Sequence, residues 1–297
     1  MQLKRKNNYL DTEIINKELE DIYLSLEMIA MNMDFCNGLI PVNGKIRYGN
    51  FSANLYSAQS TLISVDLCMG AGHFSDAFCL LRKLRDDIMQ YLFIINFNKN
   101  SKEKEGQDAE NITNDSFIEN IISLYNNYLK QFSISKEGQA IKAWILNDLD
   151  RESRKVFGAS KYKKTLVDDE NIKFMHNTYL ESMWTKTDRI LNDYVHSNGL
   201  KYLQDNYFVM DKEAIRNQVI NVSKYIFSLF ISYLSIIDAR ALSSSDYLDS
   251  LEMGEQPIEG SQYYVMPIIT DYMKRNFPSD LVEYIDSHNI FGMKFKV

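Results

Sequence analysis

Proline, glycine and cysteine are all scarce in this chain, and each shortage excludes a class of structure. The 297 residues include 12 glycines and 4 prolines, and the prolines are Pro41, Pro257, Pro267 and Pro278. Residues 42–256 therefore hold no proline. Since proline ends or kinks helices, and all-β proteins use glycine and proline in their many turns, this distribution favours long helices. We expect an all-α protein built as a multi-helix bundle.

The three cysteines do not form a disulfide framework or a metal motif. Cys36, Cys68 and Cys79 are odd in number and lack metal-type spacing. Such thiols are typical of reduced proteins of the cytoplasm rather than of secreted ones. The chain also has no P-loop, no His-Glu-x-x-His zinc motif and no dinucleotide fingerprint. We therefore expect a cytoplasmic protein with no metal site and no cofactor.

Excess positive charge and a long uninterrupted apolar run are also missing. The formal net charge is −7, so a general basic surface that coats nucleic acid is excluded, and any RNA contact has to be local. The most apolar stretch, residues 219–239, is interrupted by Asn221, Ser223 and Lys224. This pattern predicts a buried bundle helix and no membrane association.

What the chain does have is apolar residues recurring at helical spacing along most of its length. A single domain over residues 1–297 is expected, with a core bundle at about 10–240 and a small C-terminal appendage at about 263–297. Residues 34–51, 98–114 and 243–262 are predicted as loops, and a short strand at 292–297. The predicted helices cover residues 10–33, 52–69, 75–97, 116–132, 136–148, 168–183, 185–197, 211–239, 266–277 and a segment after 278.

Three local signals predict where helices begin and end. Gly70-Ala-Gly72 predicts a turn between two long antiparallel helices, after which Ser75 or Asp76 caps the next helix. Asn198-Gly199 predicts a left-handed end to the helix over residues 185–197. Asp211 is expected to open the long apolar helix.

The stretch from Arg189 to His196 comes closest to chemistry. At 100° per residue, seven residues nearly complete two turns, so Arg189, Asn192 and His196 share one helix face that is about 10 Å long. A guanidinium binds phosphate, and an imidazole carries protons near neutral pH. These side chains are therefore candidates for one catalytic site.

An Arg-x6-His pattern late in a helical chain resembles the catalytic signature of the HEPN superfamily of helical-bundle ribonucleases and toxins. The segment from His73 through Arg82 and Arg85 to Asp86 also looks like the helix-turn-helix with an Arg-x-x-x-(Asp/Glu) step of bacterial relatives linked to abortive infection. The resemblance covers about residues 52–240. It implies a metal-independent endoribonuclease that acts as a toxin or antiphage effector. It also implies a homodimer, and an antitoxin or regulatory protein as a possible partner.

The resemblance gives each candidate residue a role. His196 would be the acid and base at the ribose 2′-hydroxyl or the leaving oxygen, and Arg189 would clamp the scissile phosphate. Asn192 or Asp193 would orient the imidazole or the ribose. Arg82 and Arg85 would add substrate phosphate affinity. Dependence on the 2′-hydroxyl implies RNA as the substrate and a 2′,3′-cyclic phosphate as the product end.

Three alternatives stay open from the residues alone. Arg82 with Asp86 and Lys83 with Asp87 are i,i+4 pairs of the kind common on a solvated helix face. The second alternative is a non-catalytic HEPN-like module that binds a protein, a nucleotide or RNA ends. More remotely, Asp86-Asp87 and Asn192-Asp193 loosely resemble the two metal-binding motifs of class I terpenoid synthases, which hold Mg²⁺ against a diphosphate.

Overall fold

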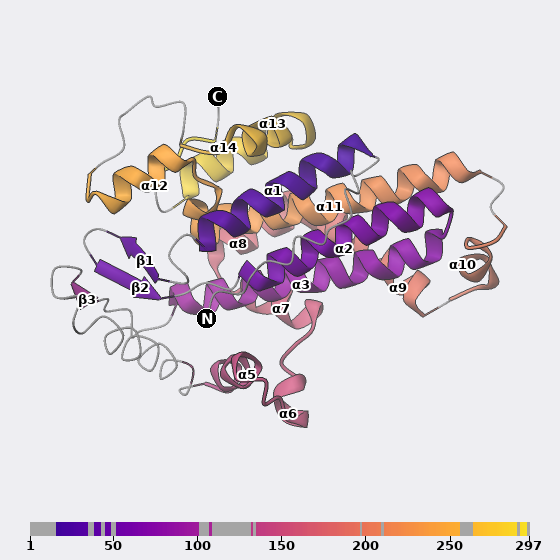
Figure 1. Ribbon diagram of the computed structural model, residues 1–297, viewed down its shortest axis with the longest axis horizontal. Helices are drawn as coiled ribbons and strands as arrows, with labels where there is room; N and C mark the ends of the chain where they lie inside the picture. Colours follow the sequence, from indigo (N-terminus) through magenta and orange to yellow (C-terminus); the bar gives the residue numbers. More distant parts are fainter. Residues whose placement is uncertain are drawn as a thin grey trace, which may run out of the picture.

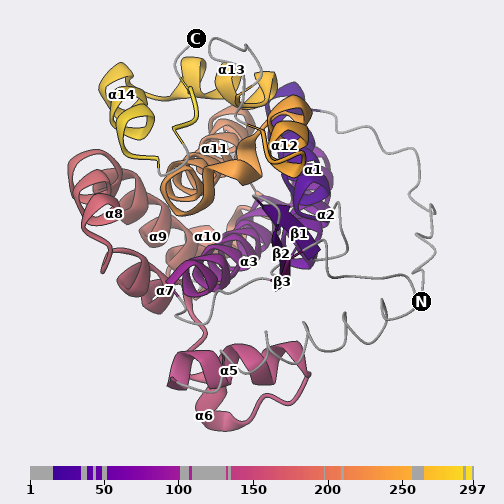
Figure 2. The same cartoon turned by 90° about the vertical axis from the view of Figure 1, so that its left-hand side faces the viewer.

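Helices dominate the computed structural model, which describes residues 16–34, 39–42, 45–48, 52–100, 107–108, 132, 135–196, 198–208, 211–255, 264–289 and 292–295. Two 27-residue helices, α3 (Phe74–Asn100) and α11 (Lys212–Asp238), pack against each other in the middle of the bundle. Around them lie α1 (Lys17–Asp34), α2 (Ser52–Ala71) and α9 (Glu181–Val195) (Figure 1 and Figure 2). The all-α bundle expected from the sequence is confirmed.

The turn between α2 and α3 has the predicted position. Gly72 adopts a left-handed φ of 81°, and its N–H donates to the carbonyl of Met69 at 3.2 Å. The N–H of His73 donates to the carbonyl of Cys68 at 2.8 Å. These two bonds form a Schellman motif, which satisfies the last carbonyls of α2 and reverses the chain. The predicted cap at Ser75 or Asp76 is wrong, because α3 already begins at Phe74.

Helix α11 forms the most buried part of the bundle. Asp211 caps it as predicted, since its side chain accepts a hydrogen bond from the N–H of Ala214. The stretch Lys212–Leu242 is long and apolar enough to cross a membrane, but its most apolar window is 83% buried inside the bundle. The C-terminal half of α11 is buried on all sides, which explains why apolar residues occur all around that part of the helix, whereas Lys212, Glu213 and Arg216 near its start are exposed.

Between the central helices the chain forms several shorter ones. These are α5 (Lys136–Ile145), α6 (Arg151–Arg154), α7 (Ala159–Leu166) and α8 (Glu170–Met175). A π-helical turn, His176–Leu180, joins α8 directly to α9. The predicted break between two helices near residue 184 is therefore wrong. The π turn accommodates one extra residue within the helix and does not end it. The predicted helix at 116–132 lies outside the described residues except for Phe132.

The end of α9 also differs from the prediction. The helix stops at Val195 with His196 as its C-cap, and Gly199 has no left-handed φ. The N–H of Asn198 closes the end by donating to the carbonyl of Asp193 at 3.0 Å. The short helix α10 (Leu200–Gln204) follows.

A small antiparallel sheet lies within two segments predicted as loops. It consists of β1 (Leu39–Val42), β2 (Lys45–Tyr48) and β3 (Gln107–Asp108), in the order β1-β2-β3. Pro41 pairs with Ile46 in β2, and β3 adds only two residues to the other edge. The loop predictions at 34–51 and 98–114 are wrong at these strands, because pairing between strands, within the β1–β2 hairpin and between β2 and β3, supplies hydrogen bonds that apolar periodicity does not reveal.

The C-terminal appendage packs on the bundle. It includes the 3₁₀ turn η4 (Ala239–Leu242), α12 (Ser245–Glu252), α13 (Pro267–Asn276) and α14 (Ser279–His288). Arg275 on α13 forms an ion pair with Asp21 on α1 at 2.8 Å, and the Asn32 amide donates to the carbonyl of Ser243 at 2.9 Å. Helix α12 corrects the predicted loop at 243–262. Residues 292–295 form no strand, and the rest of that predicted strand lies outside the described residues.

Candidate functional site

His196 lies at the exposed C-terminal end of α9. Its N–H donates to the carbonyl of Asn192 at 3.0 Å, and its side chain remains exposed to solvent. The geometry leaves the ring accessible to a ligand.

The cation that contacts His196 is Arg82, which comes from α3. Its Nη1 atom lies 3.4 Å from Nε2 of the imidazole, although 114 residues separate the two in the chain. A guanidinium has only donors, so Nε2 must accept this hydrogen bond and the ring proton sits on Nδ1. A phosphate that took over the guanidinium of Arg82 would leave the basic Nε2 atom free. The packing of α3 against α9 thus creates a pair of an anion-binding group and a base.

Arg85, one turn further along α3, has a different environment. It is 4% exposed, and its guanidinium donates to Asp188 on α9 at 2.8 Å and to Asp86 at 3.0 and 3.1 Å. Two carboxylates therefore already occupy this cation, and little of it faces solvent. Its geometry supports a role in holding α3 against α9 and gives no support to the predicted role in substrate binding.

Arg189 is exposed and forms no hydrogen bond or ion pair within the described part of the chain. Its charge does reach Tyr202: burial and a hydrogen bond to Asp193 raise the pKa of Tyr202, and the charge of Arg189 opposes that rise. Arg189 therefore remains available for an anion. The side chain in contact with His196, however, is Arg82.

Asn192 and Asp193 take up partners other than the imidazole. The amide of Asn192 donates to Asp188 at 3.1 Å, which extends the network around Arg85. The carboxylate of Asp193 accepts hydrogen bonds from Asn198 and from the hydroxyl of Tyr202, each at 3.2 Å. Both residues shape the end of α9, and their predicted role in orienting the ring has no contact to support it.

Sequence reasoning missed Asp188, which links Arg85 on α3 to Asn192 on α9. It contacts Arg85 and Asn192, and it lies four and eight residues before Asn192 and His196 on the same side of α9. The Asp-x3-Asn-x3-His spacing was the available signal. The predicted i,i+4 pair of Arg82 with Asp86 is wrong, because Asp86 pairs with Arg85 instead.

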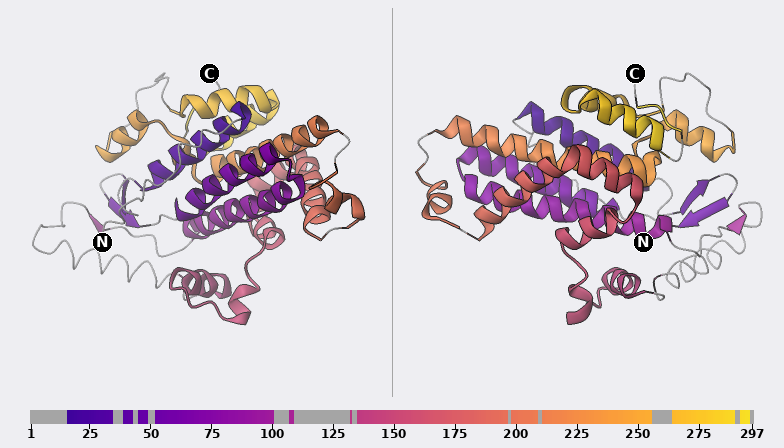
Figure 3. Two further views of the ribbon diagram at one scale, coloured as in Figure 1. Left: turned by 45° about the vertical axis from the view of Figure 1, so that its right-hand side comes forward. Right: turned by 180° about the vertical axis from the view of Figure 1, so that it is seen from behind.

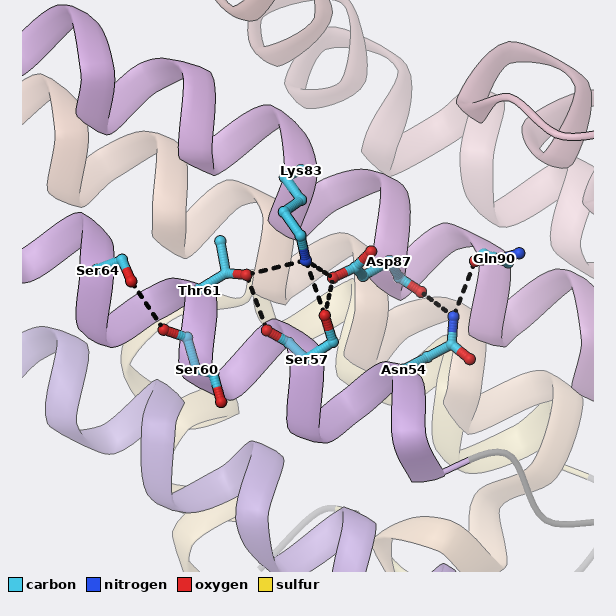
Figure 4. A network of polar contacts seen from close by, with 8 residues as sticks. All are labelled: Asn54, Ser57, Ser60, Thr61, Ser64, Lys83, Asp87 and Gln90. Atoms are coloured by element: carbon cyan, nitrogen blue, oxygen red, sulfur yellow. Dashed lines mark hydrogen bonds and ion pairs between the residues drawn. The ribbon is translucent and has the colours of Figure 1, made fainter. Parts of the chain in front are cut away.

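A second polar cluster joins α2 to α3 (Figure 4). The ammonium group of Lys83 lies 2.5 Å from Asp87, as predicted for an i,i+4 pair, and 2.7 Å from the hydroxyl of Ser57. The hydroxyl of Ser57 in turn donates to Asp87 at 2.7 Å, and Thr61 accepts from Lys83 at 3.2 Å. The ammonium group of Lys83 donates to Ser57, Thr61 and Asp87, so its hydrogen bonds are directed to groups within the cluster. The cluster is best explained as a polar seam between two helices.

A third cluster is buried around the π turn. Nδ1 of His176 lies 2.7 Å from the hydroxyl of Tyr233, and Nε2 hydrogen-bonds to Glu181, which also accepts from Lys163 at 3.1 Å. Burial, and then the charge of Lys163, lower the pKa of His176 below its ordinary value of 6.5. Burial raises the pKa of Tyr233. His176 itself is 1% exposed, so its ring is part of the core.

The carboxylates that a terpenoid-synthase site would need point to other partners. Asp86 pairs with Arg85, Asp87 with Lys83, and Asp193 with two donors at the end of α9. Within the described ranges, no three histidine, cysteine, aspartate or glutamate side chains gather so that they could hold a metal ion. This geometry does not favour the remote alternative.

Comparisons of the chain with family models, with curated proteins and with solved structures found no match. The function is therefore argued from the site itself.

Proposed function

We propose that the protein is a metal-independent endoribonuclease of HEPN type, with His196 as the base and Arg82 and Arg189 as the phosphate-binding cations. The observation that carries the proposal is the 3.4 Å contact between Arg82 and His196. It brings a phosphate ligand and a proton acceptor together at an exposed position on two packed helices. The two free or lightly held cations also offset the negative charge of the chain at the point where RNA would bind.

The chemistry needs only groups that the site already contains. The phosphate displaces Arg82 from the imidazole, and Nε2 of His196 then accepts the proton of the ribose 2′-hydroxyl. The 2′-oxygen bonds to phosphorus while the bond from phosphorus to the 5′-oxygen breaks, and this oxygen takes a proton from water. Arg82 and Arg189 stabilise the charge that builds on the phosphate oxygens. The products are a 2′,3′-cyclic phosphate and a 5′-hydroxyl end, and the imidazolium releases its proton to solvent.

An uncontrolled ribonuclease of this kind would damage the cell that makes it. We therefore place the proposed enzyme among toxins or antiphage effectors in the cytoplasm, held silent by an antitoxin or regulatory protein until it is needed. This part of the proposal rests on the resemblance stated above.

The test is cleavage of single-stranded RNA by the purified protein in excess chelator. We expect products with 2′,3′-cyclic ends, and none from an oligonucleotide whose riboses all lack the 2′-hydroxyl. His196→Ala should lower the rate about 10²- to 10⁴-fold, and Arg82→Ala about 10²- to 10³-fold. Arg189→Ala should raise KM or lower kcat, which shows whether this cation binds the ground state or the transition state.

Two matched variants serve as controls. Arg216→Ala removes an exposed arginine from α11, and His288→Ala removes a histidine from α14, and both should cleave like the wild type. The proposal fails if the folded wild-type protein leaves RNA intact, or if His196→Ala cleaves as fast as the wild type. RNA binding without cleavage would favour the non-catalytic module instead.

A further inference from the structure

An exposed apolar patch lies directly after the candidate site, on α10 and the turn that follows it. Leu200 is 66% exposed, Leu203 53%, Tyr207 74% and Phe208 64%. Of the eleven large hydrophobic side chains that are exposed in the described part of the chain, these four fall within nine consecutive residues. Exposed apolar side chains that are concentrated in this way commonly mark a binding surface.

The segment that carries this patch is held firmly in place. Tyr194 on α9 donates to the buried Asp205 at 2.8 Å, and the N–H of Ser75 at the start of α3 donates to the side chain of Asn206 at 2.8 Å. The hydroxyl of Ser75 also donates to the carbonyl of Tyr202. The patch is therefore exposed because the fold fixes it there, at the end of the bundle near the α2–α3 turn (Figure 3).

The backbone also fixes the two aromatic residues relative to α10. The N–H groups of Tyr207 and Phe208 both donate to the carbonyl of Gln204, at 2.9 and 2.7 Å. Two adjacent rings thus stand in solvent on a short, hydrogen-bonded turn. A flat aromatic ring in water is the surface on which an unpaired nucleobase stacks, whatever the base.

We propose that Tyr207 and Phe208 form a stacking platform for unpaired bases of the RNA strand whose phosphate lies at Arg82 and His196. This inference rests on the proposed function and specifies its substrate as single-stranded RNA. Continuity carries it: α10 begins four residues after His196, and Tyr202 on α10 lies within reach of the charge of Arg189. The nearby acids Asp193 and Asp205 accept hydrogen bonds from tyrosines, which moderates their repulsion of a phosphate chain.

The experiment measures binding without cleavage, using a fluorescein-labelled oligoribonucleotide with 2′-O-methyl groups and its abasic counterpart with the same phosphates. For the wild type, we expect the base-containing strand to bind at least tenfold more tightly than the abasic strand. The Tyr207→Ala/Phe208→Ala double variant should lose that preference, and Tyr207→Phe/Phe208→Tyr should keep it. Phe174→Ala, which removes an exposed aromatic ring from α8, is the matched control and should bind like the wild type.

The outcomes separate the platform from the nuclease. If the wild type does not cleave RNA but shows a base preference that the double variant loses, the platform stands and the nuclease proposal falls. If the wild type cleaves and the double variant binds both strands as the wild type does, with unchanged KM, the platform is overturned and the nuclease stands. Failure of the wild type to bind either strand overturns the platform. The platform is also overturned if the Tyr207→Ala/Phe208→Ala variant changes only the self-association of the protein, measured by sedimentation, and not its binding of RNA.

Discussion

At the residue scale, burial gives two arginines that lie one turn apart on α3 different environments. Arg82 reaches the exposed His196, whereas Arg85 is surrounded by Asp86 and Asp188 and is 4% exposed. The same type of side chain therefore stays accessible beside an imidazole at one position and joins two helices at the other. The sequence alone offers both as phosphate ligands, because they differ only in which side of α3 they occupy.

This difference in burial predicts that removing Arg85 lowers stability much more than removing Arg82. Arg85→Ala should lower the free energy of unfolding by about 2 kcal/mol, because it leaves two half-buried carboxylates without their shared cation. Arg82→Ala should change stability by less than about 0.5 kcal/mol, since its contact is at the surface. Urea unfolding followed by circular dichroism measures both. Equal stability of Arg85→Ala and the wild type would contradict the role assigned to the Asp188 pair.

The buried His176 predicts a pH-dependent stability. Because its pKa is lowered in the folded protein, the unfolded chain binds the proton more readily, so its contribution is present above about pH 6.5 and is lost as pH falls below that value. Burial raises the pKa of Glu181, but hydrogen bonds from Lys163 and His176 and the charges of these two residues together lower it below its ordinary value of 4.5, which adds to the loss at still lower pH.

The measurement is the unfolding free energy at pH 7.5, 6.5 and 5.5. The wild type should lose stability over this range, and His176→Gln should lose less, although it starts lower because a buried hydrogen-bonded group has changed. The exposed His73 offers the control, since His73→Gln should keep the slope of the wild type. A parallel slope for His176→Gln would show that other groups cause the dependence.

At the element scale, the α2–α3 turn shows what a single glycine contributes. A Cβ atom added at Gly72 would meet nothing within 4 Å, so the only cost of alanine there is its left-handed φ of 81°. Gly72→Ala should therefore lower stability by about 1 to 2 kcal/mol.

Gly158 provides the matched control for this prediction. It is equally unobstructed, but its φ of 162° lies in the extended region that any residue adopts. Gly158→Ala should change the urea midpoint much less than Gly72→Ala. If both variants unfold at the same urea concentration, the left-handed φ at position 72 does not destabilise an alanine there, and the prediction is wrong.

The joining of α8 to α9 through a π turn has a consequence at the same scale. The turn at His176–Leu180 sets the rotation of α9, which in turn decides that Asp188 faces α3 while Arg189 faces solvent. It also brings His176 to Tyr233 on α11. One irregular turn thus positions both a buried polar cluster and the exposed site.

At the scale of the whole molecule, we propose that two copies form the active enzyme. In a single site water protonates the leaving 5′-oxygen, whereas a symmetric dimer would bring a second His196 to the shared axis as a stronger acid for that step. Sedimentation equilibrium should then give twice the chain mass of 34.7 kDa at concentrations where RNA is cleaved. Mixing wild-type chains with an excess of His196→Ala chains should reduce the activity of each wild-type chain. Full activity from a monomer would overturn this arrangement.

Much of the helical framework could be predicted from the sequence, because a helix is defined by contacts three and four residues apart. The spacing of apolar residues located α2, α3, α11 and α13, and Gly72 and Asp211 marked ends that the structure confirms. The predictions failed where distant segments decide the outcome. Strand β3 depends on pairing with β2 across about 60 residues of chain, and neither the strands nor the π turn has a local periodicity of its own.

Its residues alone predict that this protein is a helical bundle, where most of its helices run, and that His196 lies near the end of one of them beside polar neighbours. The packing of α3 against α9 selects the arginine that meets that imidazole and pairs Arg85 with Asp188, and the turn after α10 exposes two aromatic rings. The two kinds of information differ in range, because backbone hydrogen bonds and hydrophobic periodicity act within a few residues. The rotation of one packed helix against another, which chose Arg82, is set by the core as a whole.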